Sequence, residues 1–249
     1  MGFENFGDKS LPSSFSSSAS SSISHLAAQT CVVIPAYQAE EMVAPLVKSI
    51  RSQGLIVVVV DDASVDATAL KAEEAGAMVI RRPVNGGKGA ALRQGLSEAL
   101  KGKFQWFLTI DADGQHLPEE LSLFLAEAAA GSCDLIVGNR MWNPRGMPFE
   151  RRFTNWFMSR LLFRITKQRV PDTQCGYRIV SRRALEKICL TADRYEIDSE
   201  FVVKAAWAGF TIKSIPISSV YRRELSFIRP FQDTVRFFRF LATIKRPSV

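Results

Sequence analysis

The chain has 249 residues, of which 47% are hydrophobic and 23% charged, so a wholly disordered, collagen-like or coiled-coil protein is excluded. Its formal net charge of +7 is unevenly distributed. Residues 1–139 hold 10 Lys and Arg against 16 Asp and Glu, whereas residues 140–249 hold 22 against 9. This asymmetry predicts that the basic half meets anions, which are nucleic acid, an anionic membrane surface or a phosphorylated substrate.

The first 29 residues are expected to form a disordered tail. Ten of the fifteen residues from Ser10 to Ser24 are serine, and such a stretch has too little apolar surface to offset the entropy of ordering it. The tail also lacks the basic start and apolar middle of a secretory signal. The chain contains no run of about 18 uncharged apolar residues, so no transmembrane helix is expected.

The cysteines indicate a reducing compartment rather than a disulfide framework. They form no CxxC pair and show no zinc-ligand spacing, so four reduced thiols in a cytosolic protein are expected. The four are Cys31, Cys133, Cys175 and Cys189.

In the first half of the chain, strands and helices are expected to alternate. Continuous apolar runs predict buried strands at residues 31–34, 55–60, 78–80, 106–110 and 134–137. Helical spacing of apolar residues predicts helices at 40–53, 65–75, 89–100 and 118–130. This alternation implies right-handed βαβ units in a mostly parallel sheet with helices on both faces, which is an α/β fold.

The second half is expected to add helices and one strand to the same domain. Helices are predicted at 149–166, 181–189, 197–208 and 226–244, with a loop at 171–178 and a strand at 211–220. No long linker or repeat separates the halves. We therefore expect one catalytic domain over 30–225, followed by a basic amphipathic helical extension over 226–249.

Two carboxylates follow the strand expected at 106–110. In open α/β sheets, ligands bind beyond the carboxyl ends of the strands. Asp111 and Asp113, with Gln115 close behind, offer the hard oxygen ligands that suit Mg²⁺ or Mn²⁺, which would also hold substrate phosphates. The alternative is an ordinary acidic loop. His116 is expected to be a loop or packing residue.

Two further segments fit a phosphorylated ligand. Asp62 ends the second strand, where an acid can accept hydrogen bonds from ribose hydroxyls or a base, although helix capping by Ser64 with Asp66 in the first turn is also possible. Asn85-Gly-Gly-Lys88-Gly lets backbone approach a ligand, and Lys88 would meet a phosphate. The GxxxxGK[ST] and GxGxxG motifs are absent, which argues against a P-loop protein and a dinucleotide-binding oxidoreductase.

These segments together resemble a known family. VIPAYQAEE, VVVVDDASVDAT, NGGKGAAL and TIDADGQH, in that order, are similar to family 2 glycosyltransferases with the GT-A fold. The segment DTQCGYR at 172–178 resembles the polyprenyl-phosphate sugar transferases of that family, such as the dolichyl-phosphate mannose synthases. The resemblance covers roughly residues 30–240 and implies a membrane-associated hexosyltransferase.

The resemblance implies a role for each matching residue on the donor side. Pro35, Tyr37 and Glu40 match the motif that lines the nucleotide-base pocket, where Gln38 replaces the usual asparagine, and Asp62 matches the acid that holds the nucleotide. The residues expected to bind the metal and the diphosphate are Asp111, Asp113 and Gln115, and Arg222 is expected to meet the donor diphosphate.

On the acceptor side, the resemblance implies arginines that face a phosphate. Arg140 matches one such arginine, Arg178 ends the segment DTQCGYR, and a second acceptor arginine is expected at Arg151 or Arg152. The residues expected to be catalytic are Asp113, Arg140 and Arg178.

The scarcity of histidine favours a phosphate acceptor. An alcohol acceptor needs a general base poised near neutral pH, but the chain holds only His25 and His116. A phosphate monoester has a second pKa of about 6 and needs only cations that orient it, which arginine provides. In-line attack by such a phosphate would invert the anomeric centre.

Three other functions remain possible from the residues alone. The enzyme could use a saccharide hydroxyl as acceptor, or it could be a nucleotidyltransferase. In a different class, the basic half could bind nucleic acid, although no recognition motif is present and no nucleic acid is expected. The preferred partners are a nucleotide-diphosphate sugar, GDP-mannose or a UDP-sugar, and polyprenyl phosphate.

The segments 149–166 and 226–244 mix aromatic residues with arginine. Such helices can lie in the headgroup region of a membrane, aromatic side chains down and arginines on lipid phosphates. The alternative is ordinary core helices with solvated charges. We expect a peripheral protein on the cytoplasmic face of a membrane.

Overall fold

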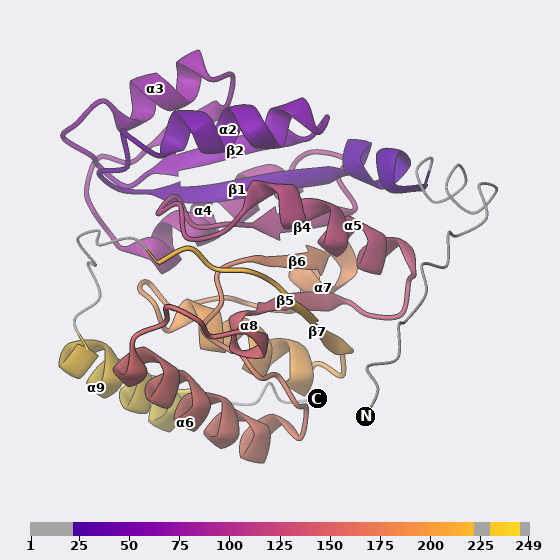
Figure 1. Cartoon of the computed structure of the whole chain (residues 1–249), viewed down its shortest axis with the longest axis vertical. Coiled ribbons are helices and arrows are strands. Elements are labelled where there is room, and N and C mark those ends of the chain that lie inside the picture. The colour runs from indigo at the N-terminus through magenta and orange to yellow at the C-terminus, as the bar shows by residue number, and fades with distance from the viewer. Residues whose placement is uncertain (1–21, 222–229, 245–249) are drawn as a thin grey trace, which may run out of the picture.

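The computed structural model describes residues 22–221 and 230–244. Its centre is a seven-stranded sheet with the order β3-β2-β1-β4-β6-β5-β7, covered by helices on both faces (Figure 1). Among the described strands β6 alone runs antiparallel to its neighbours, so the expected α/β fold with a mostly parallel sheet is confirmed. The strands are β1 Thr30–Ala36, β2 Ile56–Asp61, β3 Met78–Arg81, β4 Trp106–Thr109, β5 Leu135–Asn139, β6 Arg178–Ser181 and β7 Ile212–Pro216.

The helices lie close to the predicted segments. They are α2 Val43–Ser52, α3 Thr68–Glu74, α4 Lys88–Leu100, α5 Leu121–Ala129, α6 Phe149–Thr166, α7 Arg182–Lys187, α8 Ile197–Trp207 and α9 Pro230–Thr243, with short 3₁₀ turns η1 Pro118–Glu120 and η2 Arg140–Trp142. The helices expected at 40–53 and 65–75 begin three residues late, because the loops in front of them are tied to each other by hydrogen bonds described below.

Three expectations are corrected by the structure. Residues 22–28 are helical rather than disordered, because Leu26 and Ala27 pack into the core; residues 1–21 lie outside the described part. The strand expected at 211–220 is only β7, since the chain beyond it runs over the loop that carries Gln115. Strand β6 was not predicted, and Arg178 begins it instead of lying in a loop.

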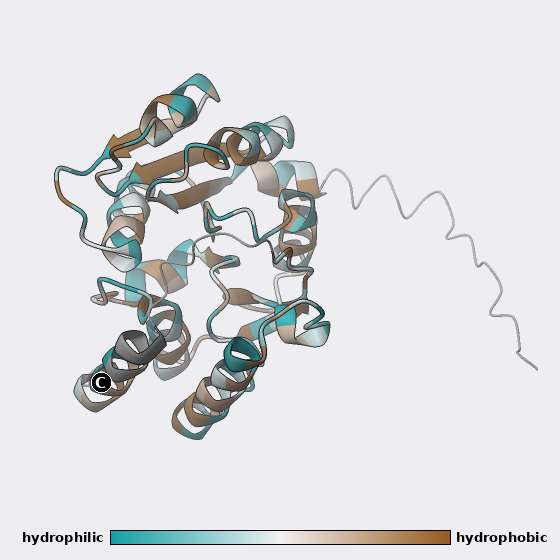
Figure 2. Cartoon of the chain, turned by 60° about the vertical axis from the view of Figure 1, so that its left-hand side comes forward, coloured by the Kyte–Doolittle hydropathy of each residue, from teal (hydrophilic) through white to brown (hydrophobic). Residues whose placement is uncertain are grey.

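The core is built from the apolar strands. Residues 31–34 of β1 and 57–60 of β2 are buried almost completely, and Figure 2 shows the strands as hydrophobic segments enclosed by helices. Because side chains on both faces of these strands are apolar, the sheet is stable only with helices on each side. The polar residues that follow β1, β2 and β4 are thereby left at one edge of the sheet.

Helices α6 and α9 lie at the end of the molecule opposite α3 (Figure 1). A second apolar cluster joins α6, α8 and α9 through Met158, Leu162, Val203 and Phe237, and the rings of Phe157 and Phe238 are 6.4 Å apart. Helix α9 lies within the segment 226–249, for which a helical extension was expected, and residues 222–229 and 245–249 lie outside the described part. Whether it is a separate unit stays a prediction.

In the part of the chain that the structure describes, no helix is both long enough and apolar enough to cross a membrane.

The end of α6 gives a test of the backbone. Lys167, which is exposed, adopts a left-handed conformation with φ of 60°, and its N–H donates to Phe163 O at 2.8 Å. This conformation costs an L-residue about 1–2 kcal/mol, so Lys167→Gly should raise the free energy of unfolding by about 1 kcal/mol. The matched control is Lys101→Gly at the end of α4, where φ is −68°. Urea denaturation should show no gain for it, and equal gains in both variants would contradict the explanation.

Candidate active site

The loops that follow β1 and β2 are joined by hydrogen bonds. Gln38 N donates to Ser64 Oγ at 2.9 Å and Ala39 N donates to Thr68 Oγ1 at 2.8 Å. In the other direction, Ala67 N donates to the Glu40 carboxylate at 3.1 Å. These bonds fix both loops at the carboxyl edge of the sheet.

Three residues expected in the nucleotide-base pocket stand at this edge. Pro35 is half-buried in β1, and Tyr37, the next residue but one, is 36% exposed. Glu40 uses its carboxylate to hold the neighbouring loop and lies 3.5 Å from Lys71 Nζ. Pro35, Tyr37 and Glu40 thus lie at the end of β1 and in the loop that follows it, at the carboxyl edge of the sheet.

Asp62 supports the glycine loop. Its Oδ1 accepts from Arg82 Nη1 at 2.8 Å and from Gly86 N at 3.0 Å, and its Oδ2 accepts from Gly87 N at 2.7 Å. The side chain is almost completely buried. Asp62, expected to contact the nucleotide, is thus occupied by protein donors and acts by fixing the loop that precedes Lys88.

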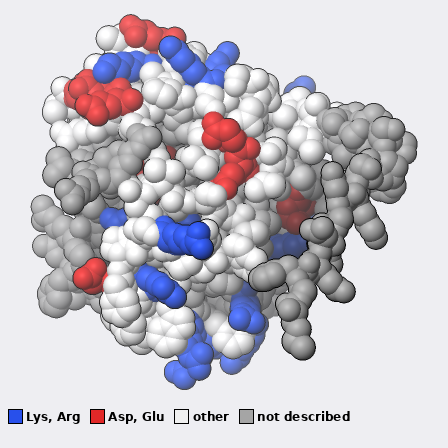
Figure 3. All heavy atoms as spheres, in the orientation of Figure 1, with Lys and Arg blue, Asp and Glu red and all other residues white. Residues whose placement is uncertain are grey.

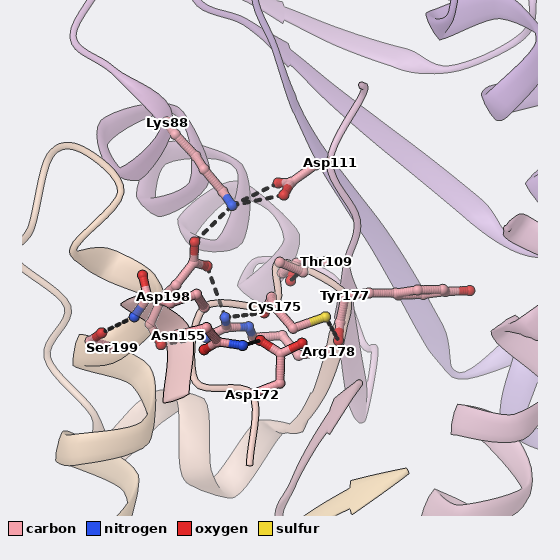
Figure 4. Close-up of polar contacts among 12 residues, drawn as sticks. Lys88, Thr109, Asp111, Asn155, Asp172, Cys175, Tyr177, Arg178, Asp198 and Ser199 are labelled. Atoms are coloured by element: carbon pink, nitrogen blue, oxygen red, sulfur yellow. Dashed lines mark hydrogen bonds and ion pairs between the residues drawn. The ribbon is translucent and has the colours of Figure 1, made fainter. Parts of the chain in front are cut away.

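Lys88 lies between two carboxylates (Figure 4). Its Nζ is 2.8 and 2.9 Å from the two oxygens of Asp111 and 2.9 Å from Asp198 Oδ2. Burial alone would lower the pKa of Lys88, but attraction to Asp111 and Asp198 raises it well above the usual value. Burial alone would likewise raise the pKa of Asp111, but Lys88 lowers it. Lys88 is therefore charged and held next to the expected metal site.

Arg178 lies behind Asp198 and does not reach the site. Its side chain is fully buried, and Nη2 lies 2.8 Å from Asp198 Oδ1 while Nη1 donates to Asp198 O at 2.9 Å. Nη2 also donates to Cys175 O, and the ring of Phe201 lies 5.1 Å from the guanidinium carbon. The expected contact of Arg178 with an acceptor phosphate is not supported, because a guanidinium enclosed by protein partners cannot meet a ligand.

Asp111 and Asp113 suit a divalent cation that arrives with a diphosphate. Asp113 is exposed and accepts from Gln115 N at 3.0 Å. Partial desolvation, followed by repulsion from Asp111, raises the pKa of Asp113, an effect that a nearby cation would relieve. No group of three His, Cys, Asp or Glu among the described residues could hold a metal alone. Because Mg²⁺ often combines one or two carboxylates with substrate phosphates, Asp111, Asp113 and Gln115 fit this kind of site.

Close packing against Asp111 explains why the segment DTQCGYR has a glycine at position 176. A Cβ at this position would overlap with the carboxylate of Asp111. The peptide is held from the other side, because Thr109 Oγ1 donates to Gly176 O at 2.7 Å. Backbone thus packs directly against the acid of the expected metal site, and a larger residue would force this carboxylate to move.

Arg140, which follows β5, is clamped by a buried acid. Its Nε and Nη2 donate to the two oxygens of Asp172 at 2.8 and 2.9 Å, and Asn155 of α6 donates to Asp172 at 2.8 Å. Burial alone would lower the pKa of Arg140, but Asp172 raises it. A guanidinium has five N–H groups, so this clamp leaves others for a ligand.

A pocket of about 350 Å³ opens at the start of α6, beside Met141 of η2. Arg152 is exposed and lines this pocket, whereas Arg151 is half-buried and does not. Of the two acceptor arginines considered, Arg152 thus shares a pocket with Met141, the residue after Arg140, and the role of either arginine stays a prediction. Arg222 lies outside the described residues. The pocket is lined by Met141, Phe149, Arg152, Phe153 and Trp156.

Neither histidine is placed to act as a base near neutral pH. His116 is buried beside the ring of Tyr177, and burial together with Arg140 lowers its pKa to about 4. His25 pairs with Gln29 before β1, at the opposite end of the strand from Tyr37. His116 is thus the packing residue that was expected.

Sequence reasoning missed Asp198, Asn155 and the clamp by Asp172. Asp172 stands in the segment that suggested the family, which was a usable signal. Asp198 resembles any acid in the first turn of a helix, and Asn155 resembles a polar position on a helix surface. No local pattern distinguishes these two from residues without a role.

Comparisons with known proteins identify the family and agree with the fold. The family model described as glycosyl transferase family 2 matches residues 31–189, and the chain belongs to that family. The UDP-N-acetylglucosamine–dolichyl-phosphate N-acetylglucosaminyltransferase of Methanococcus voltae is 29% identical over 213 residues, which cover 76% of this chain and 85% of that protein. The polyprenol monophosphomannose synthase of Mycolicibacterium smegmatis is 31% identical over 218 residues, which cover 78% of each chain.

A solved structure shows the same fold. The glucosyl-3-phosphoglycerate synthase of Mycobacterium tuberculosis, in complex with Mn²⁺, uridine diphosphate and glucosyl-3-phosphoglycerate, superposes with a TM-score of 0.67 at 19% identity. The match covers 88% of this chain and 81% of that chain. This chain is therefore a glycosyltransferase with the GT-A fold.

The packing at Gly176 leads to a prediction. Gly176→Ala should push the Asp111 carboxylate away from Lys88 and lower glycosyl transfer by about 100-fold or more, the scale seen when one stabilising group of an active site is lost. Thermal unfolding should change little, because the carboxylate is partly exposed and can turn outward. Normal transfer by a folded variant would contradict the tight packing.

Proposed function

We propose that this glycosyltransferase moves a sugar from a nucleotide-diphosphate sugar to a polyprenyl phosphate, with inversion and with Mg²⁺ or Mn²⁺. The observation that carries the proposal is Arg140, clamped by Asp172 near an acidic site that lacks a histidine base. The two relatives named above as acting on dolichyl phosphate and polyprenol support the same acceptor class.

On the donor side, the acidic residues would bind the cation and the basic residue would bind the diphosphate. Asp111, Asp113 and Gln115 would hold the cation, which would neutralise the charge that develops on the leaving diphosphate. Lys88, fixed by the loop that Asp62 supports, would bind the same diphosphate. These positions follow the carboxyl ends of β2 and β4, where α/β sheets bind ligands.

On the acceptor side, the reaction would need arginines that orient a phosphate and no general base. A phosphate monoester is largely dianionic near pH 7, since its second pKa is about 6, so its oxygen attacks without losing a proton. Arg140 and Arg152 would orient that phosphate, because guanidinium groups bind phosphate bidentately. Direct attack opposite the leaving diphosphate would invert the anomeric centre.

The surface around α6 suits contact with a membrane, where a lipid-linked acceptor would lie. Several large aromatic side chains of α6 and η2 are exposed, and arginines stand among them. Figure 3 shows Lys and Arg side chains gathered at the lower end of the face, around α6. Aromatic side chains with arginine favour the interface of an anionic bilayer. The exposed aromatic residues are Trp142, Phe149, Phe153, Trp156, Phe157 and Phe163.

We place the protein on the cytoplasmic face of that membrane. None of its four cysteines is in a disulfide, and Cys189 is exposed as a free thiol. Exposed free thiols persist in a reducing compartment.

The proposed reaction is tested with labelled nucleotide sugars. GDP-mannose, UDP-glucose and UDP-N-acetylglucosamine are each incubated with undecaprenyl phosphate and Mn²⁺, and the label in the lipid phase is measured. One donor should label the lipid, and Asp113→Ala should lower that rate by about 100-fold or more. Glu127→Ala, which removes a carboxylate from a surface ion pair, is the control. Transfer that persists without the lipid phosphate would point to a hydroxyl acceptor, and near-normal Asp113→Ala activity would refute the metal assignment.

Membrane docking is tested by flotation with vesicles of phosphatidylcholine and phosphatidylglycerol. The double variant Phe153→Ser with Trp156→Ser should bind about tenfold or more weakly, since burying one aromatic side chain contributes about 1.5–3 kcal/mol. Leu70→Ser with Leu123→Ser removes two exposed apolar residues from α3 and α5 and should bind normally. Equal loss in both double variants would contradict docking through α6.

A further inference from the structure

Four alternating charges run from the surface of the site into the core. Asp111, Lys88, Asp198 and Arg178 follow one another at distances between 2.8 and 2.9 Å (Figure 4). We propose that Lys88 is an internal counter-cation for Asp111, which keeps a divalent cation out of the site until a nucleotide diphosphate draws Lys88 away, and that Asp198 is the positioning residue that anchors Lys88. The proposal rests on the nucleotide-diphosphate donor of the proposed function.

The inner end of the row is rigid. Arg178 binds both the side chain and the backbone carbonyl of Asp198, and both residues are buried. Removing either partner would leave an uncompensated charge inside the protein. Asp198 therefore stays where it is, whatever binds at the surface of the site.

The outer end of the row can move. Lys88 begins α4, and the glycines on either side of it pack so closely on residues 192–194 that a Cβ would overlap there. Its backbone is thus fixed, while the flexible four-carbon side chain can carry the ammonium between partners. The side chain of Lys88 is 12% exposed and that of Asp111 is 23% exposed, so both are partly open to solvent.

This arrangement predicts that the site binds a divalent cation weakly when no nucleotide is present. Lys88 neutralises Asp111, which leaves Asp113 as the only expected metal carboxylate without a cationic partner among the described ion pairs. A diphosphate would offer oxygens to Lys88 and to the cation at once. Release of Asp111 by the diphosphate then couples the two binding events, and such coupling is reciprocal.

The experiment measures Mn²⁺ binding by electron paramagnetic resonance, with and without UDP or GDP, so it needs no turnover. The wild-type protein should bind Mn²⁺ weakly alone and more tightly with one of the two nucleotides. Lys88→Met should bind Mn²⁺ alone about tenfold or more tightly than wild type, because a cation next to Asp111 is gone. Adding the nucleotide should then raise the affinity of Lys88→Met for Mn²⁺ only slightly.

Asp198→Asn should act in the opposite direction. Asparagine keeps the shape and the backbone bond to Arg178, but Lys88 then has only Asp111 as a charged partner. Mn²⁺ alone should bind more weakly than in wild type. The control is Lys213→Met, which removes a lysine from an exposed ion pair with Glu127 and should leave Mn²⁺ binding unchanged. Circular dichroism shows whether each variant is folded.

The outcomes separate this inference from the proposed function. If folded Lys88→Met binds Mn²⁺ alone no more tightly than wild type, the counter-cation role is wrong even where the nucleotide binds. If Asp198→Asn matches Lys88→Met, the anchoring role is wrong. If the wild-type protein binds neither UDP nor GDP, the proposed donor fails and this inference fails with it.

Discussion

Buried carboxylates fix the loops at the carboxyl edge of the sheet, and the site depends on them. A carboxylate removed from water is stable only where donors or cations replace its hydration. Asp62 obtains these donors from Arg82 and the glycine loop, whereas Asp172 obtains them from Arg140 and Asn155. Each acid thereby joins segments that are distant in the sequence, and few arrangements of the loops satisfy all of the acids together.

The sheet and its acidic edge could be predicted because both depend on local patterns. The continuous apolar run at 55–60 is typical of a strand in a parallel sheet that is covered on both faces. Asp111 and Asp113 follow directly after another such run. Strand β6 was not predicted, because only Ile179 and Val180 of its four residues are apolar and it directly follows a segment interpreted as a loop. Its antiparallel direction places Arg178, the first residue of β6, beside Thr109 and Val137 toward the carboxyl edge of the sheet, where the side chain is buried against Asp198.

The pairing of charges across the sheet was also beyond sequence reasoning. Lys88 and Asp198 are 110 residues apart, and neither residue carries a local signal of the other. The excess of Lys and Arg in residues 140–249 likewise does not reveal which groups these side chains contact in the fold. Arg182 donates to the backbone carbonyls of Leu100 and Phe104, and Arg183 pairs with Asp134. Part of the excess positive charge is therefore used to hold the fold.

The clamp on Arg140 has a consequence for the cost of binding. A free arginine side chain carries about 2 kcal/mol of rotamer entropy, which a ligand must remove when it immobilises the group. Asp172 already holds the guanidinium at both Nε and Nη2. The ordering of this side chain is thus complete when the protein folds, and an anion that meets the remaining N–H groups keeps more of its interaction energy as affinity.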